Sequence, residues 1–248
     1  MAGGGGGGGK ELFSSEDSGR WRASLDSYDQ VLTLLASSKK RGSSSSSLKL
    51  LDKWYQKELS VSVTSRSKPH LTHEELCQLM QWKLARGKFR PRLMEMVRQN
   101  SPEDVEKVTG SAIGALPDLE RAVRLATQLR AVGPATASAI LCAASHDVPF
   151  MADEAAASVV PSLGKLTYSL KQYLTYARLL QEKASRLNRG DGEMVWSAHD
   201  VELALWSNHL STRLPQDIQS SLLGKRDTAP QPSTNSRKKA KQSADSSP

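Results

Sequence analysis

A glycine–proline pair between two helical patterns is the feature that most restricts the fold of this chain. Apolar residues in the range Glu120–Leu129 recur at the spacing of three and four that is typical of a helix. Gly133 supplies a position without Cβ constraints, and Pro134 fits the first position of a new helix. The small and apolar residues from Ala135 to about Ala144 predict a second, buried helix. The segment therefore predicts two helices joined by a tight turn.

The start of that second helix and one downstream carboxylate predict a place for a ligand. The first N–H groups of a helix lack partners within it, and together with the helix dipole they suit a phosphate. Asp153 follows Gly133 by twenty residues. One interpretation is that Asp153 caps a helix beginning near Glu154, since aspartate is common before such runs. The other is that its charge acts on a bound ligand, and the two are compatible.

This segment resembles the helix-hairpin-helix/Gly-Pro-Asp superfamily of DNA glycosylases. The interval from Gly133 to Asp153 agrees with that family, and the motif covers roughly residues 120 to 160, with a looser similarity from about Thr72 to Asn208. The residues that carry the match are Leu129, Val132, Gly133, Thr136, Ala137 and the run Val148–Asp153. The resemblance implies an all-α, multi-helix domain of the DNA-glycosylase type that contains a helix-hairpin-helix.

The resemblance also implies a role for Asp153. In the family, this carboxylate stabilises the positive charge that develops on the sugar as the base leaves, and it activates the attacking water. The position of the lysine in bifunctional members is Ala135 here, so Schiff-base chemistry through that position is excluded. We therefore expect a monofunctional DNA glycosylase of base-excision repair that hydrolyses a base–sugar bond.

Departures from the family pattern favour an alternative. Ala131 replaces the first hairpin glycine, and Glu154-Ala155-Ala156 replaces the residues that usually follow the aspartate. A non-catalytic DNA-binding or scaffold module that keeps the hairpin and has lost its base pocket would also carry these changes.

A basic cluster extends the predicted DNA-binding surface. Residues 83–98 carry a net charge of +5. Basic residues at a helix C-terminus complement its dipole, which accounts for Lys83 and Arg86, but a phosphate-facing loop better explains the cations beyond Gly87. We expect Trp82 and Phe89 to pack rather than to enter a duplex. The predicted DNA contacts are Arg130, Val132, Gly133, Ala135, Thr136, Lys83, Arg86, Lys88, Arg90 and Arg92.

Composition divides the chain into three parts. Residues 1–18 form a Gly-rich N-terminus expected to be disordered, residues 19–220 form the all-α domain with a Ser-rich loop at 42–47, and residues 221–248 form a disordered basic tail. Half of the formal net charge of +8 lies in the tail, so the overall charge says little about DNA binding by the domain.

The tail resembles a bipartite nuclear-import signal. Two basic clusters are separated by ten residues: Lys225, Arg226, Arg237, Lys238, Lys239 and Lys241. The resemblance implies importin as a partner and a nuclear location, whereas a solvated tail that binds nucleic acid loosely is the alternative.

Other helical patterns complete the all-α prediction. Helix starts are predicted at Thr72, Ser101 and Ser197, with the first helix closing near Gly87. Amphipathic patterns cover Trp21–Leu35, Leu48–Leu59 and Leu163–Leu187, and we expect their aromatic residues to form core rather than to stack on bases.

The remaining expectations concern cofactors and compartment. Cys77 and Cys142 are expected to be buried free thiols, and two cysteines cannot hold a four-cysteine iron–sulfur cluster. The five histidines lack zinc spacing, so no metal site is predicted, although the resemblance allows a monovalent cation held by hairpin carbonyls. We expect DNA as the main partner, no membrane contact and a monomer.

Overall fold

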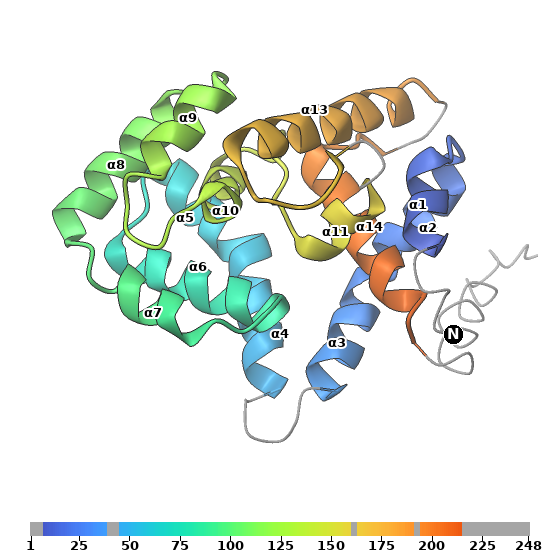
Figure 1. Cartoon of the computed structure of the whole chain (residues 1–248), viewed down its shortest axis with the longest axis horizontal. Coiled ribbons are helices and arrows are strands. Elements are labelled where there is room, and N and C mark those ends of the chain that lie inside the picture. Colours follow the sequence, from blue (N-terminus) through green and yellow to red (C-terminus); the bar gives the residue numbers. More distant parts are fainter. Residues whose placement is uncertain (1–6, 39–44, 160–162, 191–193, 215–248) are drawn as a thin grey trace, which may run out of the picture.

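The computed structural model describes residues 7–38, 45–159, 163–190 and 194–214, which form helices and no β-strand (Figure 1). The helices of the N-terminal part are α1 (Gly7–Ser14), α2 (Ser18–Asp26), α3 (Tyr28–Ser38), α4 (Ser45–Lys53), the π-helical η1 (Trp54–Leu59) and α5 (Ser60–Ser65). Those that follow are α6 (His73–Arg86), α7 (Pro91–Val97), α8 (Pro102–Gly114), α9 (Leu119–Ala126), α10 (Pro134–Ala144), α11 (Asp153–Ser158), α13 (Leu170–Leu187) and α14 (Ala198–Ser211). The all-α prediction is confirmed for these residues.

Local side-chain caps begin three of these helices where the sequence predicts. The hydroxyl of Thr72 accepts a hydrogen bond from the backbone N–H of Glu75, whose carboxylate accepts one from the N–H of Thr72. Ser101 and Ser197 likewise accept a bond from the third residue of α8 and α14. Because such caps satisfy donors that a helix leaves unpaired, they fix the starts of α6, α8 and α14.

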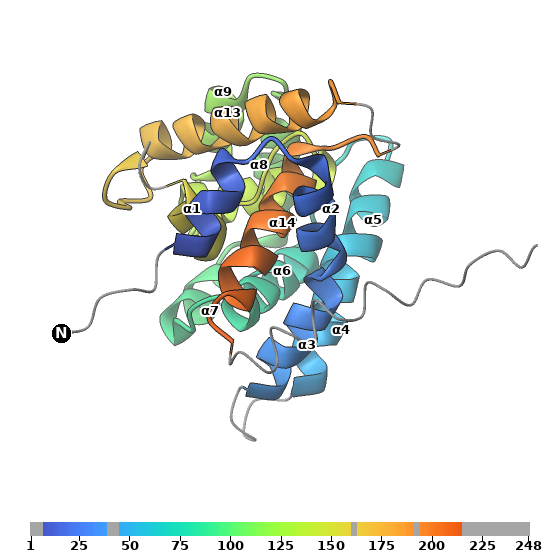
Figure 2. The same cartoon turned by 90° about the vertical axis from the view of Figure 1, so that its right-hand side faces the viewer.

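Two buried helices organise the packing. Helix α14 contacts α1, α2, α3, α11 and α13, and Figure 2 shows α1, α2, α3 and α13 around it. Helix α10 contacts α5, α6, α8, α9 and α13. Its fully buried Ala137 and Ala139 are small, so neighbouring helices can approach closely. The site described below lies at the exposed start of α10.

Several predicted boundaries differ from the structure. The pattern over Trp21–Leu35 is two helices, since the chain bends at Ser27 between α2 and α3. The pattern over Leu48–Leu59 continues through α4, η1 and α5. The one over Leu163–Leu187 is interrupted, and its long helix α13 begins only at Leu170, after the cap at Ser169.

Part of the range expected to be disordered is helical, and residues 1–6 lie outside the described residues. Within residues 1–18, α1 is a helix and Leu12 is buried. Lys183 of α13 holds this segment in place. Its ammonium group donates a hydrogen bond of 3.1 Å to the carbonyl of Ser15 and one of 2.7 Å to the carboxylate of Glu16. Within the Ser-rich range 42–47, α4 already begins at Ser45, and residues 42–44 lie outside the described residues.

Candidate functional site

In the turn between α9 and α10, the residue with a strained backbone conformation is Ala131. Ala131 has φ +63°, in the left-handed region, whereas Gly133 has φ −92° and ψ −179°, an extended conformation open to any residue. The expectation that Gly133 supplies the special backbone position is therefore wrong. A Cβ atom disfavours the left-handed region, so the alanine that replaces the first hairpin glycine carries the conformational cost.

Asn100 holds this turn against the end of α7. Its side-chain oxygen accepts a hydrogen bond of 2.8 Å from the N–H of Arg130, and its amide group donates to the carbonyls of Arg130 and Val97. The guanidinium of Arg130 donates to the side-chain oxygen of Gln99 at 2.8 Å. The turn is thus fixed by a residue thirty positions earlier in the chain, a contact that local sequence patterns do not reveal.

The start of α10 is open in front of Gly133. A Cβ atom built on Gly133 would meet no atom within 4 Å, and the first turn of α10 has no side-chain cap. Its exposed end therefore keeps the positive end of the helix dipole accessible. The predicted contact Val132, by contrast, is buried, so only its backbone could face a ligand.

A cavity of about 210 Å³ lies in front of this helix start. It is bounded by the end of α6 and the following basic loop, by the turn from Ala131 to Thr136, and by the segment from Phe150 to Glu154. Of the predicted site residues, the cavity brings together Lys83, Arg86, Lys88, Arg90, Gly133, Ala135, Thr136 and Asp153, while Arg92, Arg130 and Val132 are not part of its lining. Residues 83–93, 131–136 and 150–154, which are separate in the sequence, therefore meet at one site.

Asp153 is not a helix cap. It is the first residue of α11, and the capping position is Ala152, which provides no side-chain hydrogen bond. The Asp153 carboxylate instead accepts a 2.8 Å hydrogen bond from the hydroxyl of Tyr168 and lies 3.3 Å from the ammonium group of Lys88. The capping interpretation is therefore wrong, and the carboxylate belongs to the wall of the cavity.

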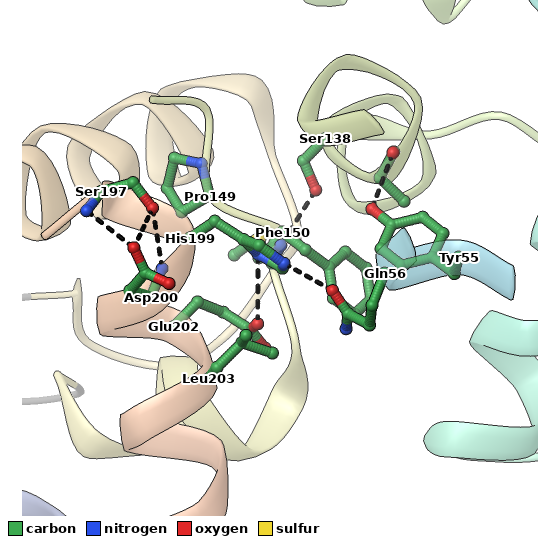
Figure 3. Close-up of polar contacts among 12 residues, drawn as sticks. Tyr55, Gln56, Ser138, Pro149, Phe150, Ser197, His199, Asp200, Glu202 and Leu203 are labelled. Carbon is green, nitrogen blue, oxygen red and sulfur yellow. Dashed lines mark hydrogen bonds and ion pairs between the residues drawn. The ribbon is translucent and has the colours of Figure 1, made fainter. Parts of the chain in front are cut away.

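The segment that carries Asp153 is fastened to two helices, as Figure 3 shows in part. The hydroxyl of Ser138 on α10 accepts a hydrogen bond from the N–H of Met151 at 2.9 Å. From α13, Tyr176 donates to the carbonyl of Phe150 at 3.0 Å, and Tyr173 donates to that of Pro149 at 3.3 Å. Burial raises the pKa of both tyrosines well above the usual value, so they remain donors. Asp153 is thus presented by a rigid support.

Tyr168 reaches Asp153 from a loop with an unusual backbone. Its φ is +54°, and the side-chain oxygen of Gln172 holds the loop by accepting hydrogen bonds from the N–H groups of Thr167 and Tyr168 at 2.7 and 3.1 Å. The guanidinium of Arg90 lies 5.9 Å from the Tyr168 ring centroid. Left-handed non-glycine residues gather at functional sites. Sequence patterning placed Tyr168 on a helix face and missed this role.

The structure corrects the prediction for Arg86. Its side chain is 1% exposed and forms two hydrogen bonds to the carboxylate of Glu202, at 2.9 and 3.4 Å. The guanidinium also lies 4.4 Å from the ring centroid of Trp206. Burial raises the pKa of Glu202, and the charge and hydrogen bonds of Arg86 oppose that rise. The guanidinium of Arg86 is therefore bound to a core carboxylate, although the residue borders the cavity, and it is not a free phosphate ligand.

The polar core continues from Glu202 toward α4–η1. Figure 3 shows His199 between Glu202 and Gln56, with its Nε2 atom 2.7 Å from the Gln56 side-chain oxygen and its Nδ1 atom 3.7 Å from Glu202. Burial holds the pKa of His199 well below its usual value, and the neighbouring His146 and Arg86 lower it further. His199 is therefore neutral, and its contact with Gln56 is part of the buried polar core.

The two aromatic residues of the basic segment behave differently. Trp82 is buried as predicted, with its ring 3.5 Å from that of Tyr55 in a stacked arrangement and its N–H donating to Asp52. Phe89, however, is 76% exposed. The expectation that Phe89 packs is wrong, because the neighbouring cations turn toward the cavity and leave the ring in solvent.

Lys83 and Glu154 are among the cavity side chains whose pKa values are perturbed. Burial lowers the pKa of Lys83, with a further decrease from Arg90 and an opposing effect of Asp153. Burial likewise raises the pKa of Glu154, where the family pattern has a different residue. Shifts of this kind cluster at functional sites.

Other expectations concern metals, thiols and the tail. No group of three or more metal-binding side chains occurs among the described residues, and none of the described helices is long and apolar enough to cross a membrane. Both cysteines are free, with Cys142 buried and Cys77 only partly so. The predicted import residues, all beyond position 214, lie outside the described residues.

Comparison with protein-family models, curated proteins and solved structures finds no match to this chain.

Proposed function

We propose that this chain is a nuclear DNA-binding protein that removes a base from DNA by hydrolysing its base–sugar bond, as a monofunctional DNA glycosylase. The observation that carries the proposal is the meeting, in one cavity, of Asp153, the start of α10 and the basic loop after α6. These three parts would supply the charge that acts on the sugar, the donors for a phosphate and the attraction for a polyanion.

DNA binding would rest on the backbone of the turn and on the loop cations. Phosphate contacts come from helix starts and from basic side chains, and they fix the orientation of a protein on a duplex. Gly133 leaves room for a phosphate in front of α10, and Lys88 and Arg90 line the same cavity. Arg92 and Arg130 are exposed nearby in the chain and would extend the surface.

Catalysis would rest on Asp153. As the base departs, positive charge develops on the sugar, and a fixed carboxylate stabilises it and can accept a proton from the attacking water. A cavity of about 210 Å³ is small beside the roughly 300–1,000 Å³ of common ligand sites, which favours a single extruded base over a whole nucleotide.

One observation favours a second candidate, a DNA-binding module without catalysis. Both oxygens of Asp153 already have partners, because Tyr168 bonds to Oδ1 and Lys88 lies against Oδ2. A carboxylate held in this way could serve to shape the loop. Under this alternative the hairpin and the basic loop would still bind the phosphate backbone.

Replacement of Asp153 by asparagine separates the two candidates. The amide side chain would keep an oxygen for the Tyr168 hydroxyl while removing the charge, and the largely exposed Lys88 pair contributes about 1 kcal/mol or less to stability. On a panel of lesion-containing duplexes, we expect the single-turnover rate to fall roughly a hundredfold or more. Asp147→Asn, at an exposed position outside the cavity, is the matched control.

The outcomes are distinct. Equal rates for the wild type and Asp153→Asn would remove the catalytic assignment. A wild type that cleaves no lesion but binds duplexes with steep salt dependence would favour the non-catalytic module.

Nuclear import through the basic tail is part of the proposal, with importin as the partner. Replacing Arg237, Lys238 and Lys239 by alanine should move a tagged protein from the nucleus to the cytoplasm. An unchanged nuclear signal would contradict this. We also propose that the protein binds DNA as a monomer, which sedimentation of the complex would test.

A further inference from the structure

Tyr168 and Lys88 hold different oxygens of the Asp153 carboxylate. The Tyr168 hydroxyl donates a 2.8 Å hydrogen bond to Oδ1, and the ammonium group of the mostly exposed Lys88 lies 3.3 Å from Oδ2. A hydrogen bond to a carboxylate is strong and directional, whereas an ion pair with an exposed lysine contributes little. Oδ1 is therefore the fixed oxygen of Asp153, and Oδ2 is the oxygen whose partner a ligand can displace.

A buried glutamine fixes the loop that carries Tyr168. The side-chain amide of Gln172 on α13 donates to the carbonyls of Leu163 and Lys165 at 3.0 and 2.8 Å. Its oxygen accepts from the backbone N–H groups of Thr167 and Tyr168. The described residues 163–168 thus fold around one side chain, which holds Tyr168 at φ +54°. Such a conformation is costly for a tyrosine and persists only where its surroundings determine it.

The other charged groups around Asp153 act through space and do not orient it. Burial is the main cause of the perturbed pKa values of Lys83, Glu154 and Tyr168, and the charge of Asp153 contributes to each of them. For Tyr168 the shift is upward, so its hydroxyl remains a donor. Arg90 lies over the Tyr168 ring rather than against the carboxylate. Among these groups, the Tyr168 hydroxyl is the one that holds Asp153 through a hydrogen bond.

We propose that Tyr168 is the positioning residue of this site: its hydroxyl holds Oδ1 of Asp153, so that Oδ2 faces the sugar and accepts the proton of the attacking water. The inference rests on the proposed function, because it requires base removal in the cavity. It deepens that function by assigning separate roles to the two oxygens. It also adds a residue from beyond positions 120 to 160, the segment that carries the motif.

Replacement of Tyr168 by phenylalanine tests the inference, because it keeps the ring and removes the hydroxyl. The full-length variant is assayed on the lesion-containing duplex that the wild type cleaves fastest. We expect the single-turnover rate to fall roughly tenfold to a hundredfold, the range for a hydrogen bond to a charged group, with the duplex Kd unchanged. Thr64→Val is the matched control, since it removes an exposed hydroxyl that bonds within α5, outside the cavity.

Two further readouts separate positioning from a merely structural role. If Tyr168 acts through Asp153, Tyr168→Phe should slow the wild type but cause little further loss in the Asp153→Asn variant. The acidic limb of the pH–rate profile should also move to higher pH, by about half a unit or more, because a hydrogen bond to the carboxylate favours its ionised form. The position of this limb does not depend on the fraction of folded protein, so it decides the question even if Tyr168→Phe is partly unfolded.

The failure of this inference differs from the failure of the proposed function. A Tyr168→Phe variant that excises as fast as the wild type would overturn the positioning role and leave the glycosylase in place. Equal rate losses in the wild-type and Asp153→Asn backgrounds, with the acidic limb unmoved, would show that Tyr168 only supports the fold. A wild type that cleaves no lesion, or an Asp153→Asn variant as fast as the wild type, would end the catalytic assignment and the Tyr168 inference together.

Discussion

The ammonium group of Lys88 lies 3.3 Å from a carboxylate oxygen of Asp153, so the proposed catalytic carboxylate is paired with a cation of the proposed phosphate-binding loop. The Lys88 side chain is 71% exposed, against 25% for Asp153. A phosphate that approaches from solvent can therefore compete for Lys88 without entering the cavity. Engagement of the DNA backbone would then release an oxygen of Asp153 toward the sugar.

Replacing Lys88 by glutamine should weaken duplex binding and its salt dependence together. If Lys88 contacts one phosphate, the slope of log K against log salt concentration should become shallower by about 0.9. Titrations at four or more salt concentrations measure this slope, with Lys107→Gln as the control. An unchanged slope would show that Lys88 pairs with Asp153 and contacts no phosphate.

Phe89 should contribute to DNA affinity through its ring. It is exposed between two cations, and aromatic or apolar side chains in such positions stack on bases or enter a base step. Phe89→Ala should cost about 1–3 kcal/mol, or roughly fivefold to 150-fold in Kd, with little change in stability. Val195→Ala, another exposed apolar position, should have no effect. Unchanged affinity would indicate that the Phe89 ring lies outside the DNA interface.

Gly133→Val should weaken binding to all duplex sequences alike. The extended backbone of Gly133 accepts any residue and the space beside it is empty, so the fold should tolerate valine. The side chain would occupy the place of a phosphate, and phosphate contacts carry no base information. Fluorescence anisotropy with several unrelated duplexes measures the effect. A loss confined to one sequence would contradict the hairpin assignment.

Ala131→Gly should stabilise the protein. Glycine removes the cost of the left-handed backbone at φ +63°, offset in part by its greater freedom in the unfolded chain. We expect the free energy of unfolding to rise by about 0.5–1 kcal/mol in chemical denaturation. Ala135→Gly, within the first turn of α10, should instead lower it by about 0.5–1 kcal/mol. A decrease for both variants would show that Ala131 is not strained.

Arg86→Met should be among the most destabilising substitutions in the chain. It leaves the buried carboxylate of Glu202 without its partner, at a cost of about 3–5 kcal/mol. Adding Glu202→Leu should recover much of the lost free energy of unfolding, because the second substitution removes the unpaired buried carboxylate. Arg98→Met, at an exposed position, should change stability by about 0.5 kcal/mol or less. Additive losses in the double variant would contradict the pairing.

Local signals explain why parts of the fold were predictable. Caps such as those at Thr72 and Ser197 act within three residues, so the sequence contains the whole interaction. The helix over Glu120–Leu129 corresponds to α9, which ends three residues early because the turn toward Ala131 begins there. The break at Ser27 lies within an unbroken apolar pattern, which gave no sign of it.

The site was predictable only in part for a related reason. Asp153 and the loop cations follow from spacing and charge, and the cavity brings them together. Arg86 has the same sequence context as Lys83, but its partner Glu202 is 116 residues away, so local patterning could not separate a core cation from a surface one. Tyr168 reaches Asp153 through a backbone conformation that periodicity does not describe.

The packing of α1 and α2 on α14 has a consequence for synthesis of the chain. Trp21 of α2 and Trp206 of α14 are both fully buried, and 185 positions separate them. At about 5–20 residues per second, a ribosome needs roughly 10–40 s to travel from one to the other. During that interval the faces that α1, α2 and α3 present to α14 are not yet covered by it. A nascent chain would therefore expose these faces to chaperones until α14 emerges and closes the domain.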